Sequence, residues 1–332
     1  SVYIEDLSQW LNMEGDLRLY NSNNRVDYYV NGEALENLVI PQDVTCIRKN
    51  AFAYGQNIKT VTFHDKVESI EENAFENCTN LKLKRDKLPN YLKRIGRQAF
   101  YNCKSLRGNL VIPDSVTEIG EYAFYNCTGL NGTLKLSANL KTIPDYAFQN
   151  CSFTGTLILP EKLEKIGRYA FYRNSFTGEL VIPDHVSQIN YDAFAYCKNI
   201  EKLVIGSGIS NIPYECFYRC EGLDEILFSD NVTTIADWAF GFCANVKTLT
   251  FLGNTPPELN GTPKTIFFGY YGMKNLETIY VPSDVLEQYK EKWSSLTGEN
   301  VVFSGDSMAL KVTGLQSVYT ISHSAKISWN PS

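Results

Sequence analysis

Cysteine is the residue type whose spacing in this chain could most readily support chemistry. Seven of the nine cysteines recur at nearly equal intervals, at Cys78, Cys103, Cys127, Cys151, Cys197, Cys220 and Cys243. Regularly spaced cysteines can ligate zinc, form disulfides or lie buried as thiols. No CxxC pair and no Cys/His pair has the spacing of zinc ligands. Stacked copies about 5 Å apart would be within bridging range, but equivalent side chains in a stack point the same way. The spacing therefore favours buried free thiols.

Few other residues have the arrangement that catalysis or cofactor binding requires. The chain has three histidines, so groups that titrate near neutral pH are scarce. Asp184-His185 resembles an acid–base pair, but both it and His64 fall where other copies of the repeat carry ordinary turn residues. HExxH, GxSxG, GxGxxG and P-loop motifs are absent. The sequence therefore predicts no catalytic residue, no metal site and no cofactor, in a chain that is not an enzyme.

Composition narrows the classes of partner. The 332 residues carry a net charge of −6, and 44% of them are hydrophobic, which is typical of a folded chain. No stripe of lysine and arginine stands out, so nucleic acid and anionic membranes are not expected partners. No apolar run reaches the roughly 18 residues of a membrane span. The chain begins at Ser1, so the lack of a signal peptide does not argue for the cytoplasm.

The spacing of phenylalanine shows that the chain is built from repeats. Phenylalanines that end an Ala-Phe or similar pair lie 23 to 25 residues apart, at Phe52, Phe75, Phe100, Phe124, Phe148, Phe171, Phe194, Phe217 and Phe240. Each follows an aliphatic residue by five positions, and one unit reads L-x-[IL]-P-x-x-V-x-x-I-x-x-x-A-F-x-x-C-x-x-L. The cysteines thus form one column of the repeat, in which Asn174 replaces cysteine once.

This unit predicts the architecture. Its L-x-I segment has the period of a short strand, and the proline that often follows cannot continue a ladder. A unit of this length cannot bury its own apolar side chains, so copies must stack over a shared core. We therefore expect an α/β repeat solenoid: a leucine-rich-repeat, right-handed superhelix with one parallel β-sheet, short strands and irregular or short helical turns, capped at both ends.

Breaks in the repeat suggest four segments. Residues 1–36 are expected to form an N-terminal cap, and residues 37–253 a solenoid of about nine repeats of 23–25 residues. Residues 254–307 should contain a last strand and a C-terminal helical cap over Val285 to Trp293, with Ser283 or Asp284 able to cap its first turn. Residues 308–332 alternate with period 2 and could begin a fibronectin type III-like domain.

The repeat resembles the BspA-like (Treponema pallidum type) leucine-rich repeats over about residues 37–282. The resemblance rests on the proline, valine, isoleucine and Ala-Phe columns at 41–52 and on the same pattern, with its cysteine, at 112–127. It implies secretion or attachment to the surface of a bacterial cell, with a role in adhesion. The family offers no catalytic residues to transfer.

Two columns are candidate binding surfaces. The outward position of each strand is expected to face solvent, at Val111, Lys135, Ile158, Val181, Val204, Leu227 and Thr250. Apolar residues occupy four consecutive positions of this column, which indicates either a docking surface on a concave face or the β-propensity of branched residues. A second, aromatic flank follows the repeat phenylalanine, at Tyr101, Tyr125, Tyr172 and Tyr218. It could form contacts with a partner or pack between turns.

Three functions are compatible with these features. The first is an extracellular binding module for protein–protein adhesion to host matrix proteins or to surface proteins of host or neighbouring cells. The second is a glycan-binding surface protein, favoured if aromatic side chains are exposed beside carboxylates or asparagines. The third is a structural spacer that presents another domain.

Overall fold

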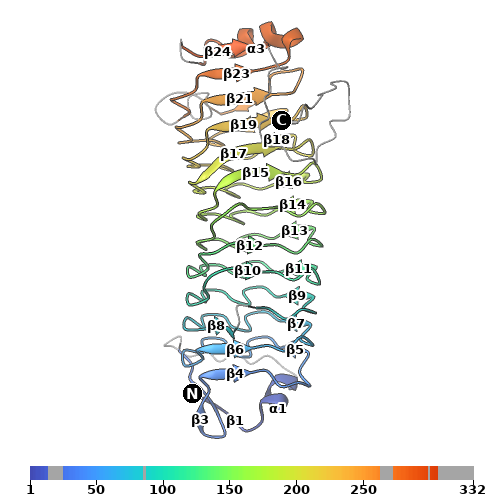
Figure 1. Ribbon diagram of the computed structural model, residues 1–332, viewed down its shortest axis with the longest axis vertical. Helices are drawn as coiled ribbons and strands as arrows, with labels where there is room; N and C mark the ends of the chain where they lie inside the picture. Colours follow the sequence, from blue (N-terminus) through green and yellow to red (C-terminus); the bar gives the residue numbers. More distant parts are fainter. Residues whose placement is uncertain (14–24, 85–86, 262–271, 298–299, 306–332) are drawn as a thin grey trace, which may run out of the picture.

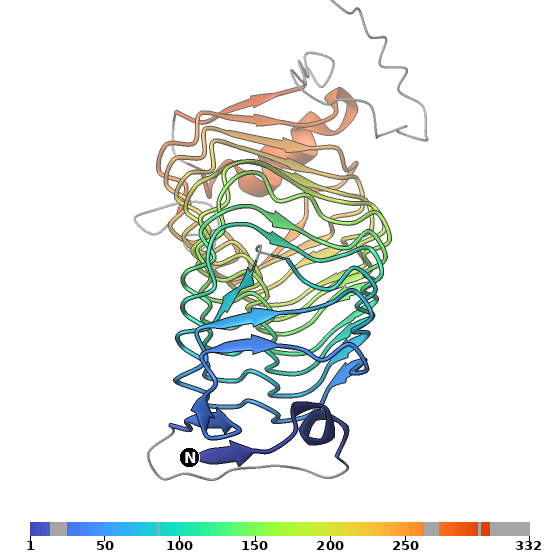
Figure 2. The same cartoon turned by 60° about the horizontal axis from the view of Figure 1, so that its bottom comes forward.

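Each copy of the repeat forms one coil of a solenoid, and successive coils stack along one axis (Figure 1). The computed structural model describes residues 1–13, 25–84, 87–261, 272–297 and 300–305. The predicted segment 308–332 lies outside these residues. Figure 2 shows the N-terminal strands and helix at one end of the column and the orange C-terminal helix at the other. The chain is therefore a capped repeat solenoid, as predicted.

The L-x-I segments form a series of parallel strands along one side of the column, which we call the first strand face. Hydrogen bonding joins them as β4-β6-β8, then β10-β12, then β15-β17-β19-β21-β23-β24. The strands are β4 (Asn37–Val39), β6 (Thr60–Thr62), β8 (Lys82–Leu83), β10 (Leu110–Val111), β12 (Leu134–Lys135), β15 (Gly178–Ile182), β17 (Ile200–Ile205), β19 (Glu225–Phe228), β21 (Thr248–Phe251), β23 (Thr278–Tyr280) and β24 (Val302–Ser304). Residues 157–159 follow the same path without forming a regular strand.

A second strand face runs along another side of the coils, where the sequence predicted only one sheet. It contains β5 (Cys46–Ile47), β7 (Ser69–Ile70), β9 (Arg94–Ile95), β11 (Glu118–Ile119), β13 (Thr142–Ile143), β14 (Lys165–Ile166), β16 (Gln188–Ile189), β18 (Asn211–Ile212), β20 (Thr234–Ala236) and β22 (Glu258–Asn260). These strands also pair in parallel. Most are two residues long, with one inward isoleucine each, and so small a segment leaves no alternation to detect in the sequence.

The Ala-Phe segment forms a third side, an arc that is neither strand nor helix. Two residues per coil have positive φ there, one two positions before the phenylalanine and one two positions after it, as at Asn73 (φ 56°) and Asn77 (φ 57°). Alternate N–H groups then point along the axis: the amides of Asn73, Phe75 and Asn77 donate to carbonyls of the next coil at 2.9, 2.9 and 2.7 Å. Asparagine tolerates this conformation better than most residues, and its recurrence was the available sequence signal.

The core is centred on the repeat phenylalanines. All are buried, and their rings stack from coil to coil with centroids 5.2–5.7 Å apart and interplanar angles of 4–16°. The aliphatic residues of both strand faces pack around this stack. Each ring is thus covered by the coils above and below, which is the burial that a single unit could not achieve alone.

The cysteine column satisfies the carbonyl groups of the same phenylalanines. The amide of Cys78 donates to the Phe75 carbonyl at 3.1 Å within one coil, and the thiol of Cys103 in the next coil donates to the same oxygen at 3.1 Å. Seven thiols make such bonds, at 3.0–3.3 Å. Asn174 substitutes for cysteine by donating to the carbonyls of Phe148 and Phe171, each at 2.9 Å. The cysteines are free thiols, as predicted.

Aromatic residues of the two terminal segments pack at the two ends of the core. The N-terminal part contains β1 (Val2–Ile4), α1 (Leu7–Asn12), β2 (Tyr28–Val30) and β3 (Glu33–Ala34). Tyr28 packs edge-on against Phe52 at 5.6 Å, and its hydroxyl donates to the Ala53 carbonyl at 3.0 Å. At the other end, η2 (Ser283–Val285) leads into α3 (Leu286–Trp293). Trp293 packs edge-on against Phe251 at 5.1 Å. No helix of the described residues has the length and apolarity needed to cross a membrane.

Replacing Phe148 by alanine should destabilise the solenoid by about 3–5 kcal/mol, because the substitution leaves a cavity between two stacked rings. Urea unfolding followed by circular dichroism would measure the loss. Ile158→Ala in the next coil is the matched control, since Ile158 is 77% exposed and its truncation should change stability by less than about 0.5 kcal/mol. Equal losses in the two variants would contradict the role assigned to the phenylalanine stack.

The thiol column should be unreactive in the folded protein. Burial raises the pKa of Cys78 to about 12 and that of Cys197 to about 12, so these thiols stay protonated at neutral pH and are poor nucleophiles. We expect Ellman's reagent to modify at most the half-buried Cys46 in the native protein and all nine cysteines after denaturation. Rapid native modification of several thiols would contradict this structure.

Candidate functional site

The predicted outward column divides into an exposed part and a half-buried part. Val111 and Lys135 lie side by side in β10 and β12, and both are exposed. Ile158 is 77% exposed and Val111 is 46% exposed, which is unusual for large aliphatic side chains on a sheet. Val181, Val204 and Leu227 are in register across β15, β17 and β19 and are half-buried. The column therefore presents aliphatic side chains over four successive coils, from Ile158 to Leu227.

Thr250 was predicted to face solvent at the end of this column, and this prediction was wrong. Thr250 pairs in register with Leu227 on one side and Tyr280 on the other, but it is only 5% exposed. Both neighbours are larger than threonine, and its short side chain lies between them. Thr250 therefore does not belong to the candidate contact surface.

The predicted aromatic flank has a different character. Tyr101, Tyr125, Tyr172 and Tyr218 are all half-buried. Tyr101 and Tyr125 stack with centroids 4.9 Å apart and an interplanar angle of 6°. A parallel row made by Tyr122, Tyr146 and Tyr169 stacks at 4.4 and 5.1 Å. The ring faces cover one another, so the tyrosines pack mainly between coils.

Toward the C-terminus the flank alternates large and small residues. Tyr172 and Tyr218 are separated by a coil that carries Ala195 at the same position, and Tyr196 fills the space beside it. Arg173 lies over the rings of Tyr172 and Tyr196 at 5.3 and 5.1 Å. Burial raises the pKa of Tyr172, and nearby Arg173 partly opposes that shift. The arginines thus pack over aromatic rings as part of the same stack.

Asp192 is a feature that sequence reasoning missed. It occupies the first positive-φ position of its coil, where most other coils carry asparagine, glutamine or an aromatic residue, and it is only 4% exposed. Burial, then the charge of Glu215 in the next coil, raises the pKa of the Asp192 carboxyl to about 7, while a hydrogen bond with Tyr169 opposes the shift. In the sequence, the only indication was that this position carries an uncharged residue in every preceding coil and a carboxylate at Asp192.

Two of the three residues considered for acid–base chemistry, Asp184 and His64, have structural partners. An Asp184 carboxylate oxygen accepts the amide of Ser207 in the next coil at 2.6 Å, and Nε2 of His64 lies 2.7 Å from the Pro41 carbonyl. Among the described residues, no group of three or more histidine, cysteine or acidic side chains is arranged to hold a metal. The stacked coils leave one aliphatic column, partly exposed, along the first strand face.

Comparison with protein families identifies the repeat. The BspA type leucine-rich repeat region matches residues 25–107, 79–201 and 164–298, which together span most of the chain. The chain belongs to the BspA-type leucine-rich-repeat family. This family is generally associated with binding and adhesion, and its members are usually not catalytic. A comparison with curated proteins gave no match.

Several solved structures are similar to this BspA-type chain. A leucine-rich-repeat protein from Bacteroides ovatus is 22% identical, with 81% of this chain and 83% of that chain covered and a TM-score of 0.39. A leucine-rich cell-surface protein from Faecalibacterium prausnitzii is 22% identical, with coverage of 87% and 93% and a TM-score of 0.41. The Treponema pallidum leucine-rich-repeat protein is 22% identical, with coverage of 64% and 78% and a TM-score of 0.32.

Replacing Asp192 by asparagine should stabilise the protein at pH 8. The folded carboxyl has a pKa of about 7, against 3.8 for the ordinary group. Between these values the folded state holds a proton that the unfolded state has released, so stability falls as pH rises from about 4 to 7 and then levels off. The asparagine side chain carries no charge, so this loss should vanish in the variant, with little difference from the natural chain near pH 4.

Thermal unfolding at pH 4, 6 and 8 would measure the effect. Asp230→Asn is the control, because Asp230 is exposed, and it should leave the pH dependence unchanged. An Asp192→Asn variant that is less stable than the natural chain at pH 8 would show that the carboxylate is stabilising and refute the assignment.

Proposed function

We propose that this chain is a protein-binding adhesion module of a secreted or cell-surface protein, and that the first strand face is its binding surface. The observation that carries the proposal is the aliphatic column on that face, in which Ile158 is 77% exposed, Val111 is 46% exposed, and Val181, Val204 and Leu227 are half-buried. Outward positions of a solvent-exposed sheet are normally polar, and contiguous exposed apolar groups mark sites of protein contact. A location at the bacterial cell surface is supported by membership of the BspA-type family, whose homologues are bacterial cell-surface proteins.

The aromatic flank gives less support to the alternative of glycan binding. Sugars pack against the open faces of aromatic rings. In this flank the faces of Tyr101 and Tyr125 cover each other at 4.9 Å, and those of Tyr122 and Tyr146 at 4.4 Å. We therefore assign the tyrosines mainly to coil packing and the strand face to recognition.

The proposal is tested by binding of the chain to a panel of host matrix glycoproteins, each native and deglycosylated. Val181→Lys/Val204→Lys places charges in the middle of the aliphatic row and should weaken binding at least about tenfold. Gln188→Lys/Asn211→Lys is the matched control, because these exposed residues lie on the same two coils but on the second strand face. It should change affinity by less than about twofold.

The outcomes separate the three functions. Binding that survives deglycosylation and is lost only in the valine double variant supports a protein adhesin. Binding that disappears on deglycosylation would favour glycan recognition. A folded chain that binds no member of the panel would favour a spacer.

A further inference from the structure

The first strand face carries an uneven distribution of charge. In its central coils five cationic side chains lie at or just before the strands, and we call them the central cations: Lys82, Lys84, Lys104, Arg107 and Lys135. The corresponding segments, residues 79–84, 104–112, 128–136 and 152–159, contain no aspartate or glutamate. Four of the five side chains are exposed and Lys82 is half-buried. None forms an ion pair with a carboxylate in the part of the chain that the structure describes.

The C-terminal coils of the same face have the opposite balance. The matching segments, residues 175–182, 198–205, 221–228, 244–251 and 274–281, carry six acidic residues: Glu179, Glu201, Glu221, Asp224, Glu225 and Glu277. Four lysines lie in the same segments, and three of them are neutralised: Lys198 pairs with Glu221 at 3.2 Å, Lys202 with Glu225 at 2.8 Å and Lys247 with Asp224 at 2.9 Å. The face is therefore positive at its centre and negative toward the C-terminus, although the whole chain is acidic.

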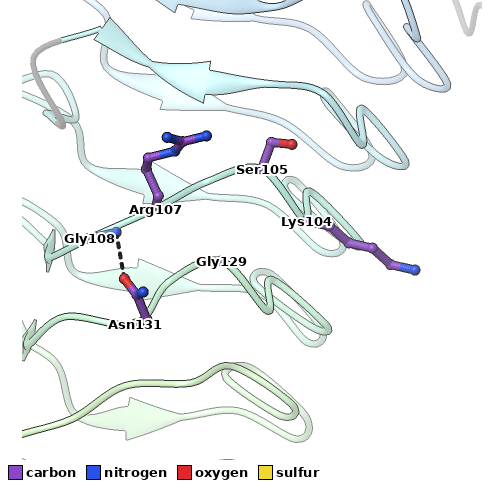
Figure 3. A pocket seen from close by; sticks show the side chains of 6 residues that line it. All are labelled: Lys104, Ser105, Arg107, Gly108, Gly129 and Asn131. Atoms are coloured by element: carbon purple, nitrogen blue, oxygen red, sulfur yellow. Dashed lines mark hydrogen bonds between the residues drawn. The ribbon is translucent and has the colours of Figure 1, made fainter.

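A hollow lies beside two of the central cations, Lys104 and Arg107. Its volume is about 540 Å³, and its lining includes Lys104, Arg107, Gly108 and Asn131 (Figure 3). The amide of Gly108 donates to the side-chain oxygen of Asn131 at 3.3 Å, which joins adjacent coils. The backbones of adjacent coils approach closely here, and Gly129 leaves the room for this approach. Any other residue would place its Cβ against the carbonyl oxygen of Leu106. In Figure 3 the side chains of Lys104 and Arg107 extend in different directions.

Exposed aliphatic groups are interleaved with these cations. Val111 lies in register with Lys135, and the next coil presents Ile158. Cations without a carboxylate partner among the described residues are available to an incoming anion, and the aliphatic groups between them offer apolar contact. The surface thus combines positive charge and hydrophobic area within three successive coils.

From this arrangement we infer that the first strand face recognises an acidic segment of its protein partner, one in which aspartate or glutamate alternates with aliphatic residues. This inference rests on the proposed function and names the chemistry of the partner. The acidic side chains pair with Lys104, Arg107 and Lys135, and the aliphatic ones cover Val111 and Ile158. Nucleic acid and sulfated glycans satisfy the cations but leave the aliphatic groups uncovered, so the combination favours protein.

The test uses the full chain and a fluorescent peptide of about 12 residues that mixes glutamate and aspartate with valine and leucine. A second peptide has glutamine and asparagine in place of the acids. Fluorescence anisotropy should show binding of the acidic peptide, and at least about tenfold weaker binding of the neutral one. Raising the salt from about 20 mM to 150 mM should reduce the affinity, because exposed charges are then screened.

Variants locate the interaction. Arg107→Glu/Lys135→Glu should reduce affinity for the acidic peptide at least about tenfold. Lys66→Glu/Lys165→Glu changes the net charge equally at exposed residues outside the central cations, and it should reduce affinity by less than about twofold. Circular dichroism of both variants would establish that each is folded. Equal losses of affinity in the two variants would show that binding depends only on the net charge of the chain, which would overturn the inference.

Parallel measurements distinguish this inference from the proposed function. If Ile158→Lys abolishes binding to a matrix glycoprotein while Arg107→Glu/Lys135→Glu does not, the face binds protein but the acidic partner is wrong. If neither variant changes the affinity for the matrix glycoprotein or the peptide, both assignments fail.

Heparin binding that depends on Arg107 and Lys135, without peptide binding, would overturn the inference in favour of an anionic glycan. Sedimentation that shows a dimer only in the natural chain would overturn it in favour of a second copy as the occupant.

Discussion

The structure depends on one constraint, which is that each coil must be covered by its neighbours. Along the axis, backbone N–H groups find their acceptors only in an adjacent coil, as when Phe75 donates to Ala99 at 2.9 Å. The phenylalanine rings follow the same rule, with spacings of 5.2–5.7 Å between coils. A unit of 23 to 25 residues forms neither contact alone, so local structure and tertiary structure form together. The aromatic residues Tyr28 and Trp293 complete the arrangement where no further repeat exists.

The same constraint explains why chemically equivalent side chains form rows. The thiols bond to phenylalanine carbonyls, the tyrosines stack on tyrosines, and oppositely charged residues of adjacent coils pair beside the arc. Lys49 pairs with Glu72 at 3.0 Å and Arg168 with Asp145 at 2.6 Å, each across one coil boundary. Exposed ion pairs of this kind contribute little individually, about 0–1 kcal/mol. Their regular placement nevertheless neutralises much of the surface charge. The central cations differ from these pairs because they have no carboxylate partner among the described residues.

The side chain can differ freely from coil to coil only at positions that stacking does not prescribe. The outward column of the first strand face accepts valine, lysine, isoleucine or leucine without altering the core, because these side chains project away from it. The coil that carries Ile158 lacks a regular strand there and exposes this residue most. A scaffold fixed by its core and variable on one face suits a family that is generally associated with binding, because the contact surface can vary while the fold is retained.

The sequence by itself determined the repeat, the stacked core, the free thiols and the family, because periodic columns of phenylalanine, isoleucine and cysteine report which side chains must meet. It did not reveal the second strand face or the positive-φ arc, since segments of two or three residues carry too little pattern. Only the tertiary structure decided that Thr250 is buried, that the ring faces of the tyrosines cover one another, and that Arg107 and Lys135 have no acidic partner among the described residues. The physical reason is that a side chain in a solenoid is neighboured by residues about 23 positions away, so its exposure and its charge balance are properties of the stack.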